Sequence, residues 1–491
     1  MPGFTWASPI SGSGLDLVMS VAADHDGNSY FTGFSQSGVI KVGAQFFTNA
    51  AFFVGKHDPN GALLWVRSYP RSRGASVAVD EVGDVYVGGV FSTNNFNLDG
   101  TTNLIRSSVI GGDDGFIARL SPDGDLKWVR QVSTTNSGGI GGGIVAVSGS
   151  NVFAAFQCPG SARLGTATIT NTGVALASFT QEGDLNSFIR VGEGIPDNVL
   201  SGIGSLSAAT DSAVYAGGFF NLGSFTIGTN VFLNAGSGDA FLAKFWPDGT
   251  CEWARNLAGA NGDSISCVQG LPDGSVVALG RCGGPASLAG TNLPIGMFLA
   301  RFSAVGDLMW AEVPWNPMPT PALAVDSHTN LYVGGELSSL VPDPHPLGLV
   351  ISKFNGNGVF QWWTNVLTAG SFVGGFNSVS SLAMDQHDGL VVGGSFGYAT
   401  LQFPAITLTN AGSTDSFIAR LATDAPQLRF EQGESSLHVS WPLAHGDFAL
   451  EKSADFTNWN ETAFSTNANA PFLESSNHLQ SPHEYFRLRA R

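Results

Sequence analysis

A short apolar strand pattern that ends in two small residues recurs seven times along this chain, at intervals that average about 60 residues. Each copy carries a Tyr, Phe or Val, followed shortly by a pair such as Gly-Gly, Thr-Gly or Ala-Ala. A regular period of this length is typical of one supersecondary unit copied in series, so it restricts the fold to a repeat architecture. The residues that anchor the seven copies are Tyr30, Tyr86, Phe153, Tyr215, Val277, Tyr332 and Val391.

Three further strands accompany each anchor strand, which we call strand B. Strand A lies upstream, is rich in Ala and Val, and reaches strand B through an Asp, Gly or Asn turn, as in residues 76–89. Strand C has the form Phe-x-Ala-Lys/Arg and leads through a Gly-containing turn into strand D, which carries Trp or Phe, as in residues 115–130. Gly and Asn accept the positive φ that tight antiparallel links require. The sequence therefore predicts the four-stranded blades of a β-propeller, with a small hairpin in the variable stretch between B and C.

The ends of the repeat region predict how the ring closes. The seventh copy has strands A, B and C at residues 381–384, 390–396 and 416–421, but an Ala-Thr-Asp-Ala-Pro-Gln segment replaces its aromatic strand D. A strand of the missing kind, at residues 4–7, precedes the first strand A. Because an open sheet edge invites aggregation, we expect this N-terminal strand to complete the seventh blade. Residues 428–430 are the alternative, as a local strand D.

The chain divides into a propeller and a C-terminal appendage. Residues 1–421 carry the repeats, residues 422–426 form a linker, and residues 427–491 show no repeat. The last segment contains three strand-like runs, and its size suits a small β-sandwich better than an eighth blade. We therefore predict an all-β protein: a seven-bladed β-propeller of four-stranded blades closed by an N-terminal strand, plus a small C-terminal β-sandwich. The candidate core residues of the sandwich are Trp441, Phe448, Leu450, Trp459, Phe486 and Leu488.

Charge and composition exclude several classes of partner. The formal net charge is −17 and no basic stripe is present, so the chain repels nucleic acid and anionic membrane surfaces. No apolar stretch reaches the roughly 18 residues that membrane insertion requires. The low content of charged residues, 12%, and the 64 glycines are typical of an all-β extracellular scaffold, so we expect an extracellular or cell-surface location. Residues 1–3 open no signal segment, and we expect a signal peptide to be absent from this chain.

Motifs that could carry catalysis or bind a metal have structural explanations within the repeat. Residues 393–397 satisfy Gly-x-Ser-x-Gly, but they form strand B of blade seven and no helix follows them. Residues 24–28 alternate oxygen ligands as a calcium loop does, yet they align with the A-to-B turns of other blades. Three of these turns hold a histidine that we expect to be solvated: His25, His328 and His387. We therefore predict no catalytic residue, no metal and no cofactor.

Repeated charged residues and the cysteines are also assigned to the scaffold. A Lys or Arg recurs in strand C of six blades, and Asp114, Asp239 and Asp415 precede three of these strands. A residue that recurs in most blades is best explained by a structural role that every blade shares. We therefore expect these Lys and Arg side chains to form ion pairs within their own blade or to cover the sheet with their aliphatic parts. Cys158, Cys251, Cys267 and Cys282 lack CxxC spacing and are expected to be free thiols. The repeated cations are Lys56, Arg119, Lys244, Arg301, Lys353 and Arg420.

Two segments carry a resemblance to a known family. Residues 114–128 read Asp-Gly-Phe-Ile-Ala-Arg-Leu-Ser-Pro-Asp-Gly-Asp-Leu-Lys-Trp, and residues 324–335 read Ala-Val-Asp, five further residues, then Tyr-Val-Gly-Gly. Both resemble the bacterial β-propeller repeat proteins of the SBBP type, which occur in large secreted or surface-exposed chains. The resemblance covers roughly residues 4–421 and implies the fold, with no catalytic residues to transfer. The C-terminal segment is similar to fibronectin-like modules of bacterial secreted proteins.

A single ligand breaks the symmetry of the ring, so the candidate contacts are residues that only one or two blades possess. The D-to-A and B-to-C connections emerge on one face of a propeller, and loops on a rigid scaffold usually carry binding. Aromatic rings and carboxylates in these connections suit carbohydrate or peptide recognition. The alternative is that these side chains are hydrophobic plugs between blades. The candidate ligand-binding residues are Trp315, His345, Phe372, Glu193 and Asp197.

Three classes of function remain open at this point. The first is a secreted or surface-exposed, non-enzymatic binding or adhesion scaffold that recognises carbohydrate or protein, because no nucleophile, base and orienting group occur together. The second is a polysaccharide-active enzyme, a lyase or hydrolase, and the third is a structural subunit of a surface assembly. A convergent pair of carboxylates or a cluster of His, Tyr and Arg on the loop face would favour the enzyme, whereas broad aromatic patches would favour binding. The sequence does not indicate the oligomeric state.

Overall fold

The computed structural model consists of β-strands joined by turns, with no helix in the residues that it describes. Among these residues no helix is long and apolar enough to cross a membrane. The structure describes residues 3–100, 103–107, 112–134, 139–192, 201–221, 223–315, 322–337, 348–375, 377–404, 406–423, 429–432, 436–442, 448–453, 460–461, 465–466, 472–478 and 485–490.

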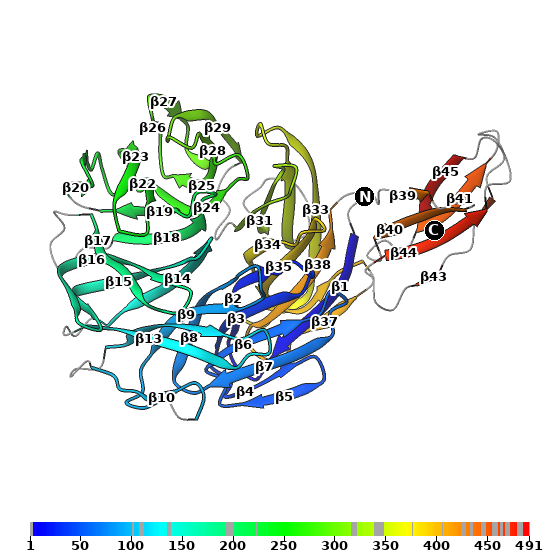
Figure 1. The fold of residues 1–491 in the computed structure, drawn as a ribbon, viewed down its shortest axis with the longest axis horizontal. Coiled ribbons are helices and arrows are strands. Elements are labelled where there is room, and N and C mark those ends of the chain that lie inside the picture. The colour runs from blue at the N-terminus through cyan, green and yellow to red at the C-terminus, as the bar shows by residue number, and fades with distance from the viewer. Residues whose placement is uncertain are drawn as a thin grey trace. The chain divides into compact units, whose positions relative to one another are not determined.

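Seven four-stranded antiparallel blades follow one another round a β-propeller ring, as the succession of colours in Figure 1 shows. This confirms the predicted fold class and the number of blades. Strands A of neighbouring blades contact one another and line the centre of the ring, and strands B, C and D follow in order. Blade 1 consists of β2 (Asp16–Ala23), β3 (Ser29–Ser35), β6 (Phe52–His57) and β7 (Leu63–Tyr69). Blade 2 consists of β8 (Ser72–Val79), β9 (Val85–Phe91), β12 (Asp114–Leu120) and β13 (Leu126–Thr134). Blade 3 consists of β14 (Gly141–Ser148), β15 (Asn151–Leu164), β16 (Ala167–Thr180) and β17 (Leu185–Val191).

The remaining four blades have the same order of strands A to D. Their strands B and C are buried along almost their whole length, because neighbouring blades cover both faces. Blades 4 to 7 consist of β18 (Ser201–Ala208), β19 (Val214–Phe220), β22 (Asp239–Phe245) and β23 (Cys251–Gly259); β24 (Ser264–Gly270), β25 (Val276–Cys282), β28 (Gly296–Phe302) and β29 (Leu308–Trp315); β30 (Ala322–Val325), β31 (Leu331–Leu337), β32 (Gly348–Phe354) and β33 (Phe360–Phe372); and β34 (Ser378–Met384), β35 (Gly389–Phe396), β38 (Asp415–Ala422) and β1 (Gly3–Ser11).

The N-terminal strand completes the seventh blade, as predicted. In the sheet order β34-β35-β38-β1, the N-terminal β1 takes the place of strand D beside β38. A side chain also joins the last blade to the first, because the Ser381 hydroxyl accepts a hydrogen bond from the Val21 N–H at 3.0 Å. The alternative strand at residues 428–430 is not used in this way. Its last two residues lie in β39 (Arg429–Gln432), which pairs with β40 (Ser436–Pro442).

The variable stretches between strands B and C form hairpins, as predicted, in the six blades where the structure describes them, but their pairing was not foreseen. Four of them pair with strand D of the preceding blade: β4 with β1, the extended end of β15 with β13, β26 with β23, and β36 with β33. These pairs cover an outer strand that would otherwise present a free edge. The additional hairpin strands are β4 (Val39–Val42), β5 (Gln45–Thr48), β10 (Phe96–Asn97), β11 (Asn103–Leu104), β20 (Ser224–Ile227), β21 (Asn230–Leu233), β26 (Ala286–Leu288), β27 (Thr291–Leu293), β36 (Tyr398–Gln402) and β37 (Thr407–Thr409).

A cluster of one carboxylate, one phenol and one cation repeats beside the A-to-B turns. In blade 6 the Tyr332 hydroxyl donates to Asp326 at 3.0 Å. The Lys353 ammonium lies 3.8 Å from the same carboxylate and 5.2 Å from the centre of the Tyr332 ring. The repeated cations of strand C are therefore intra-blade scaffold residues, as predicted. The same arrangement occurs in blades 1 and 2, with Asp24, Tyr30 and Lys56 and with Asp80, Tyr86 and Arg119.

A Trp of strand D joins blades 1, 2, 4 and 5 to the blade that follows each of them. The Trp65 indole N–H donates to the carbonyl of Pro122, in the C-to-D turn of blade 2, at 2.9 Å. The indole packs on Gly124, where φ is 82° and a Cβ would come within 3.0 Å of the ring. The turn glycine is therefore required for both its backbone conformation and this close approach. The same bond joins Trp128 to Gln181, Trp253 to Ala304 and Trp310 to Gly356.

The C-terminal residues form two further antiparallel sheets, as expected of a small sandwich. Their strand orders are β39-β40-β44-β43 and β42-β41-β45. Among the predicted core residues Leu450 is buried, and the side chains of the other five lie outside the described part of the chain. The remaining strands are β41 (Phe448–Ser453), β42 (Asn460–Glu461), β43 (Ser465–Thr466), β44 (Phe472–His478) and β45 (Tyr485–Ala490).

Candidate binding site

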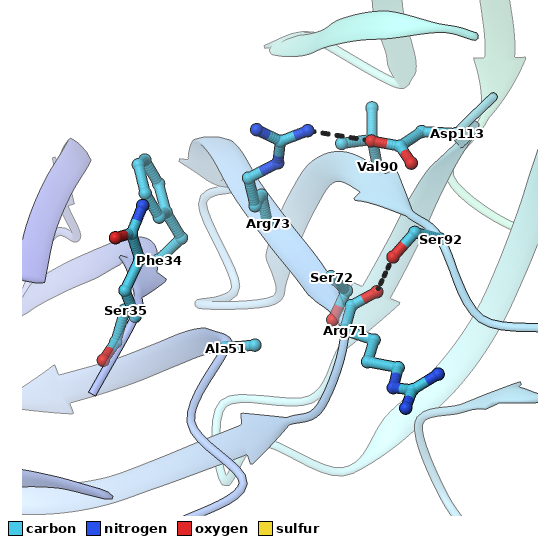
Figure 2. Close-up of a pocket in the computed structure, with 10 residues that line it drawn as sticks. Phe34, Ser35, Ala51, Arg71, Ser72, Arg73, Val90, Ser92 and Asp113 are labelled. Atoms are coloured by element: carbon cyan, nitrogen blue, oxygen red, sulfur yellow. Dashed lines mark hydrogen bonds and ion pairs between the residues drawn. The ribbon is translucent and has the colours of Figure 1, made fainter. Parts of the chain in front are cut away.

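A pocket of about 280 Å³ lies between blades 1 and 2, at the ends of the strands where the B-to-C and D-to-A connections emerge. Figure 2 shows it from close by. It therefore lies on the face of the propeller that the sequence favours for binding. Blade 1 contributes the end of β3 and the residue before β6, whereas blade 2 contributes the start of β8, the end of β9 and the residue before β12. The lining residues are Phe34, Ser35, Gln36, Ala51, Arg71, Ser72, Arg73, Val90, Ser92 and Asp113.

The turn from strand D of blade 1 to strand A of blade 2 holds Arg71 in an unusual conformation. Its φ is 52°, in the left-handed region, where an L side chain costs on the order of 1 kcal/mol. The backbone of Arg71 is held there because its carbonyl accepts hydrogen bonds from the Ser92 N–H at 3.0 Å and the Ser92 hydroxyl at 3.2 Å. In Figure 2 the Arg71 guanidinium points away from this bond and from Asp113.

The second arginine of the turn forms an ion pair across the pocket. Arg73 Nη2 lies 2.8 Å from Asp113 Oδ2, and 59% of the Arg73 side chain remains exposed. The Arg73 guanidinium is thus partly neutralised by Asp113. Arg71 is also exposed, but it has no ion pair among the described residues. Two guanidiniums within three residues give this spot a local positive character in a chain of net charge −17. Such planar forks of N–H donors match carboxylates and other planar anions.

The pocket combines these charges with hydroxyl groups and a small apolar wall. Ser35, Ser72 and Ser92 supply hydroxyls, whereas Phe34 and Val90 supply apolar surface. Among the described lining residues Asp113 is the only carboxylate, and none is a His, Tyr or Cys. The pocket therefore offers donors and a nonpolar contact for a ligand rather than an acid and a base for a reaction.

Of the five residues that the sequence singled out for ligand contact, Phe372 alone has a described side chain, and it does not line this pocket. Phe372 is 55% exposed at the end of β33, and the edge of its ring contacts Tyr398 with 5.2 Å between ring centres. Trp315 ends β29 and its backbone pairs with Met297, but its side chain lies outside the described part of the chain. Three candidates lie wholly outside the described residues: His345, Glu193 and Asp197.

The signal that sequence reasoning missed is the Pro-Arg-Ser-Arg-Gly run at residues 70–74. It places two arginines in a link between strands D and A, in a chain of net charge −17. The sequence-based search looked for departures from the repeat among aromatic and acidic residues. A search for isolated positive charge identifies this turn.

The other motifs behave as scaffold. Ser395 of the Gly-x-Ser-x-Gly pattern is 1% exposed, and its hydroxyl is hydrogen-bonded to the Ser378 hydroxyl at 2.9 Å, so it is no exposed nucleophile. His328 is solvated, as predicted, but its Nδ1 lies 3.5 Å from a carboxylate oxygen of Asp388 in the next blade. Asp326 completes a group of three possible metal ligands, and its oxygens also accept hydrogen bonds within its own turn. All four cysteines are free, as predicted.

No family model and no curated protein matches the chain. Solved structures match in fold. One is described as the Dos1 propeller, with 9% identity, a TM-score of 0.42, and coverage of 85% of this chain and 96% of that one. A second is YCF48 bound to D1 peptide, with 12% identity, a TM-score of 0.41, and coverage of 85% and 95%. A third is the polysaccharide lyase Uly1, with 10% identity, a TM-score of 0.41, and coverage of 84% and 90%. Likeness of this degree carries no argument about function.

Proposed function

We propose that the protein is a non-enzymatic binding scaffold that recognises an acidic group, in the first place a sugar acid of a polysaccharide, in the pocket between blades 1 and 2. The observation that carries the proposal is the pair Arg71 and Arg73 at a polar pocket on the loop face. Guanidinium groups bind carboxylates through two parallel hydrogen bonds. The Ser hydroxyls and the Phe34 ring suit the hydroxyls and the apolar face of a sugar.

The size of the pocket limits what it holds. Its volume of about 280 Å³ is near the lower end of the roughly 300–1,000 Å³ typical of ligand sites, so it fits one sugar ring or one side chain. A longer polymer would extend over the neighbouring loops. We also propose an extracellular or cell-surface location, which the low charge content, the many glycines and the resemblance to SBBP-type repeats support.

The chemistry of the pocket supports binding over catalysis. Glycoside hydrolysis commonly uses two carboxylates, but among the described lining residues Asp113 stands alone and is engaged by Arg73. A binding screen that also detects products tests both alternatives. We expect acidic polysaccharides to be retained without release of shorter or unsaturated products. Release of product would overturn the non-enzymatic assignment, and retention of acidic peptides alone would change the ligand class.

Two substitutions test the pocket itself. Arg71→Gly removes one guanidinium while relieving the left-handed strain, so we expect lower affinity with almost unchanged stability. Arg73→Ala should also weaken binding, at least tenfold, because it removes the second cation. Arg163→Ala is the matched control, since it removes another exposed guanidinium, one that donates to the Gly165 carbonyl in blade 3. Equal affinity of all three variants and the wild type would place the ligand elsewhere.

A further inference from the structure

Buried carboxylates meet at two seams between blades. At the seam of blades 7 and 1, Asp415 at the start of β38 neighbours Asp16 at the start of β2. At the seam of blades 4 and 5, Asp239 at the start of β22 neighbours Asp263, directly before β24. All four are buried, and within each pair the charge of one carboxylate helps to raise the pKa of the other. The two seams are thus two copies of one arrangement.

At the seam of blades 7 and 1 the chain supplies its own donors. Asp415 accepts hydrogen bonds from the N–H groups of Gly12 at 3.4 Å and Ala411 at 2.7 Å. The Ser37 hydroxyl lies 2.8 Å and 3.0 Å from the two carboxylate oxygens of Asp16. This serine comes from the B-to-C link of blade 1 and fills the space beside Gly12, because a Cβ on that glycine would overlap its side chain.

At the seam of blades 4 and 5 the corresponding donor is missing. Asp239 accepts from the N–H groups of Gly259 at 3.3 Å and Ala235 at 2.9 Å, just as its counterpart does. Asp263 Oδ1 accepts from the Gly283 N–H at 3.0 Å. Asp263 Oδ2, however, is buried and has no hydrogen-bond partner among the described residues. The B-to-C link here carries two glycines, and the side chain that it brings closest to Gly259 is the Ala286 methyl, which cannot donate a hydrogen bond as the serine does at the other seam.

Oxygen atoms converge on that space. A Cβ on Gly259 would stand 2.8 Å from Asp263 Oδ2, 2.9 Å from the Ala286 methyl and 3.1 Å from the carbonyl oxygen of Pro285, so two of its three nearest atoms are oxygens. Burial raises the pKa of Asp263 to about 6, and the charge of Asp239 contributes. The carboxyl is therefore still largely ionised at neutral pH, where a buried anionic oxygen without a partner is strongly unfavourable.

We propose that the seam between blades 4 and 5 binds a small, hard cation, Ca²⁺ in the first place, on Asp263 Oδ2, with Asp239 and the Pro285 carbonyl as further protein oxygens. Carboxylate and carbonyl oxygens are the ligands that Ca²⁺ prefers, and waters complete its shell in many sites. The preceding residues Asn261 and Gly262 are exposed, so the site lies close to the surface of the protein. The sequence-based prediction of no metal considered the A-to-B turns, which lie at the opposite ends of the strands.

Calorimetric titration of the metal-free full-length chain with CaCl₂ tests this proposal. We expect about one Ca²⁺ per chain and a higher Tm in its presence, because an ion that binds only the folded state stabilises it. Asp263→Asn should abolish both effects. Asp16→Asn, the matched change at the other seam, should retain both. Asp388→Asn is a second control, because it removes a carboxylate from the group with Asp326 and His328 and should leave the binding unchanged.

Two results would overturn the proposal. The first is the absence of binding heat and of any change in Tm with wild-type protein up to ~10 mM Ca²⁺, above the weakest affinities of extracellular calcium modules. The space would then hold water. The second is unchanged binding by a folded Asp263→Asn variant. Should that variant fail to fold, Asp239→Asn takes its place with the same expectation.

Discussion

At the residue scale, one chemical need explains the Asp, Tyr and Lys or Arg that recur in the blades. A phenol buried between blades requires an acceptor, and Asp80 supplies it to Tyr86 at 3.2 Å. Burial, with the nearby Asp80 adding to it, raises the pKa of Tyr86, so the phenol stays protonated and remains a donor. In blade 4 Ala209 occupies the position of this Asp, and the Tyr215 hydroxyl donates instead to the Gly274 carbonyl in the turn of the next blade.

Removing the cation from one such cluster should destabilise the fold and spare binding. Arg119 pairs with the buried carboxylate of Asp84 and stacks 5.5 Å from the centre of the Tyr86 ring. We expect Arg119→Ala to lower the free energy of unfolding by about 2–4 kcal/mol, because it leaves a buried charge with Lys127 as its remaining cation. Urea unfolding monitored by Trp fluorescence measures this. A loss no larger than that of Arg163→Ala would mean that the cluster contributes little.

A buried histidine should make the protein sensitive to acid. His57 ends strand C of blade 1 beside the Phe31 ring, and burial lowers its pKa to about 4. The unfolded chain binds a proton near pH 6.5, so the folded state binds fewer protons between these values. The stability due to the neutral ring is therefore complete above pH 6.5 and is lost as the pH falls towards 4.

The variant His57→Phe isolates this effect. We expect the stability of wild type relative to the variant to fall by on the order of 3 kcal/mol between pH 7 and pH 4. Urea denaturation of both proteins across this range measures the difference. A difference that does not vary with pH would show that the histidine is protonated in the folded state as easily as in the unfolded one.

At the element scale, the strands were predictable where a sequence pattern repeats. The pairing of strands from two different blades was not. Alternating apolar residues and Gly turns predicted strands A to D of every blade, and the missing aromatic strand predicted closure by β1. The pairing of the B-to-C hairpins with the preceding strand D was not predictable, since it depends on register against another blade. The β-bulges in strand A, such as the one between Val18 and Ser20, also left no sequence signal.

Loss of the N-terminal strand should open the seventh blade and lower the thermal stability of the propeller. Deletion of residues 1–10 removes most of β1, which pairs with β38 and with the hairpin strand β4. It also removes Trp6, which is 9% exposed and whose loss from a core costs roughly 3–5 kcal/mol. We therefore expect a marked fall in Tm by differential scanning calorimetry, with Trp6→Ala causing part of it. An unchanged melting curve would contradict closure by this strand.

At the scale of the whole molecule, the candidate pocket lies between blades 1 and 2, whose connecting residues differ from those of the other blades. The face was predictable, because all D-to-A and B-to-C connections emerge together. The residues were not, since the pocket joins the end of β3, the turn at Arg71 and the residue before β12, which are far apart in the sequence. Among the predicted contact residues Phe372 is exposed and its ring contacts that of Tyr398, so its part in binding stays a prediction.

The charge of the whole chain predicts an unusual salt dependence for an acidic ligand. A net charge of −17 repels such a ligand at long range, whereas Arg71 and Arg73 attract it at contact. Salt screens the long-range repulsion first, so we expect the association rate to rise between about 10 mM and 150 mM salt, over which the Debye length falls from about 30 Å to 8 Å. The dissociation rate should rise as well, because the exposed arginine contacts are weakened. Surface plasmon resonance separates the two rates, and a neutral ligand of the same size is the control. An association rate that falls steeply with salt would indicate a basic ligand, drawn by the acidic field of the whole chain rather than held by the two arginines.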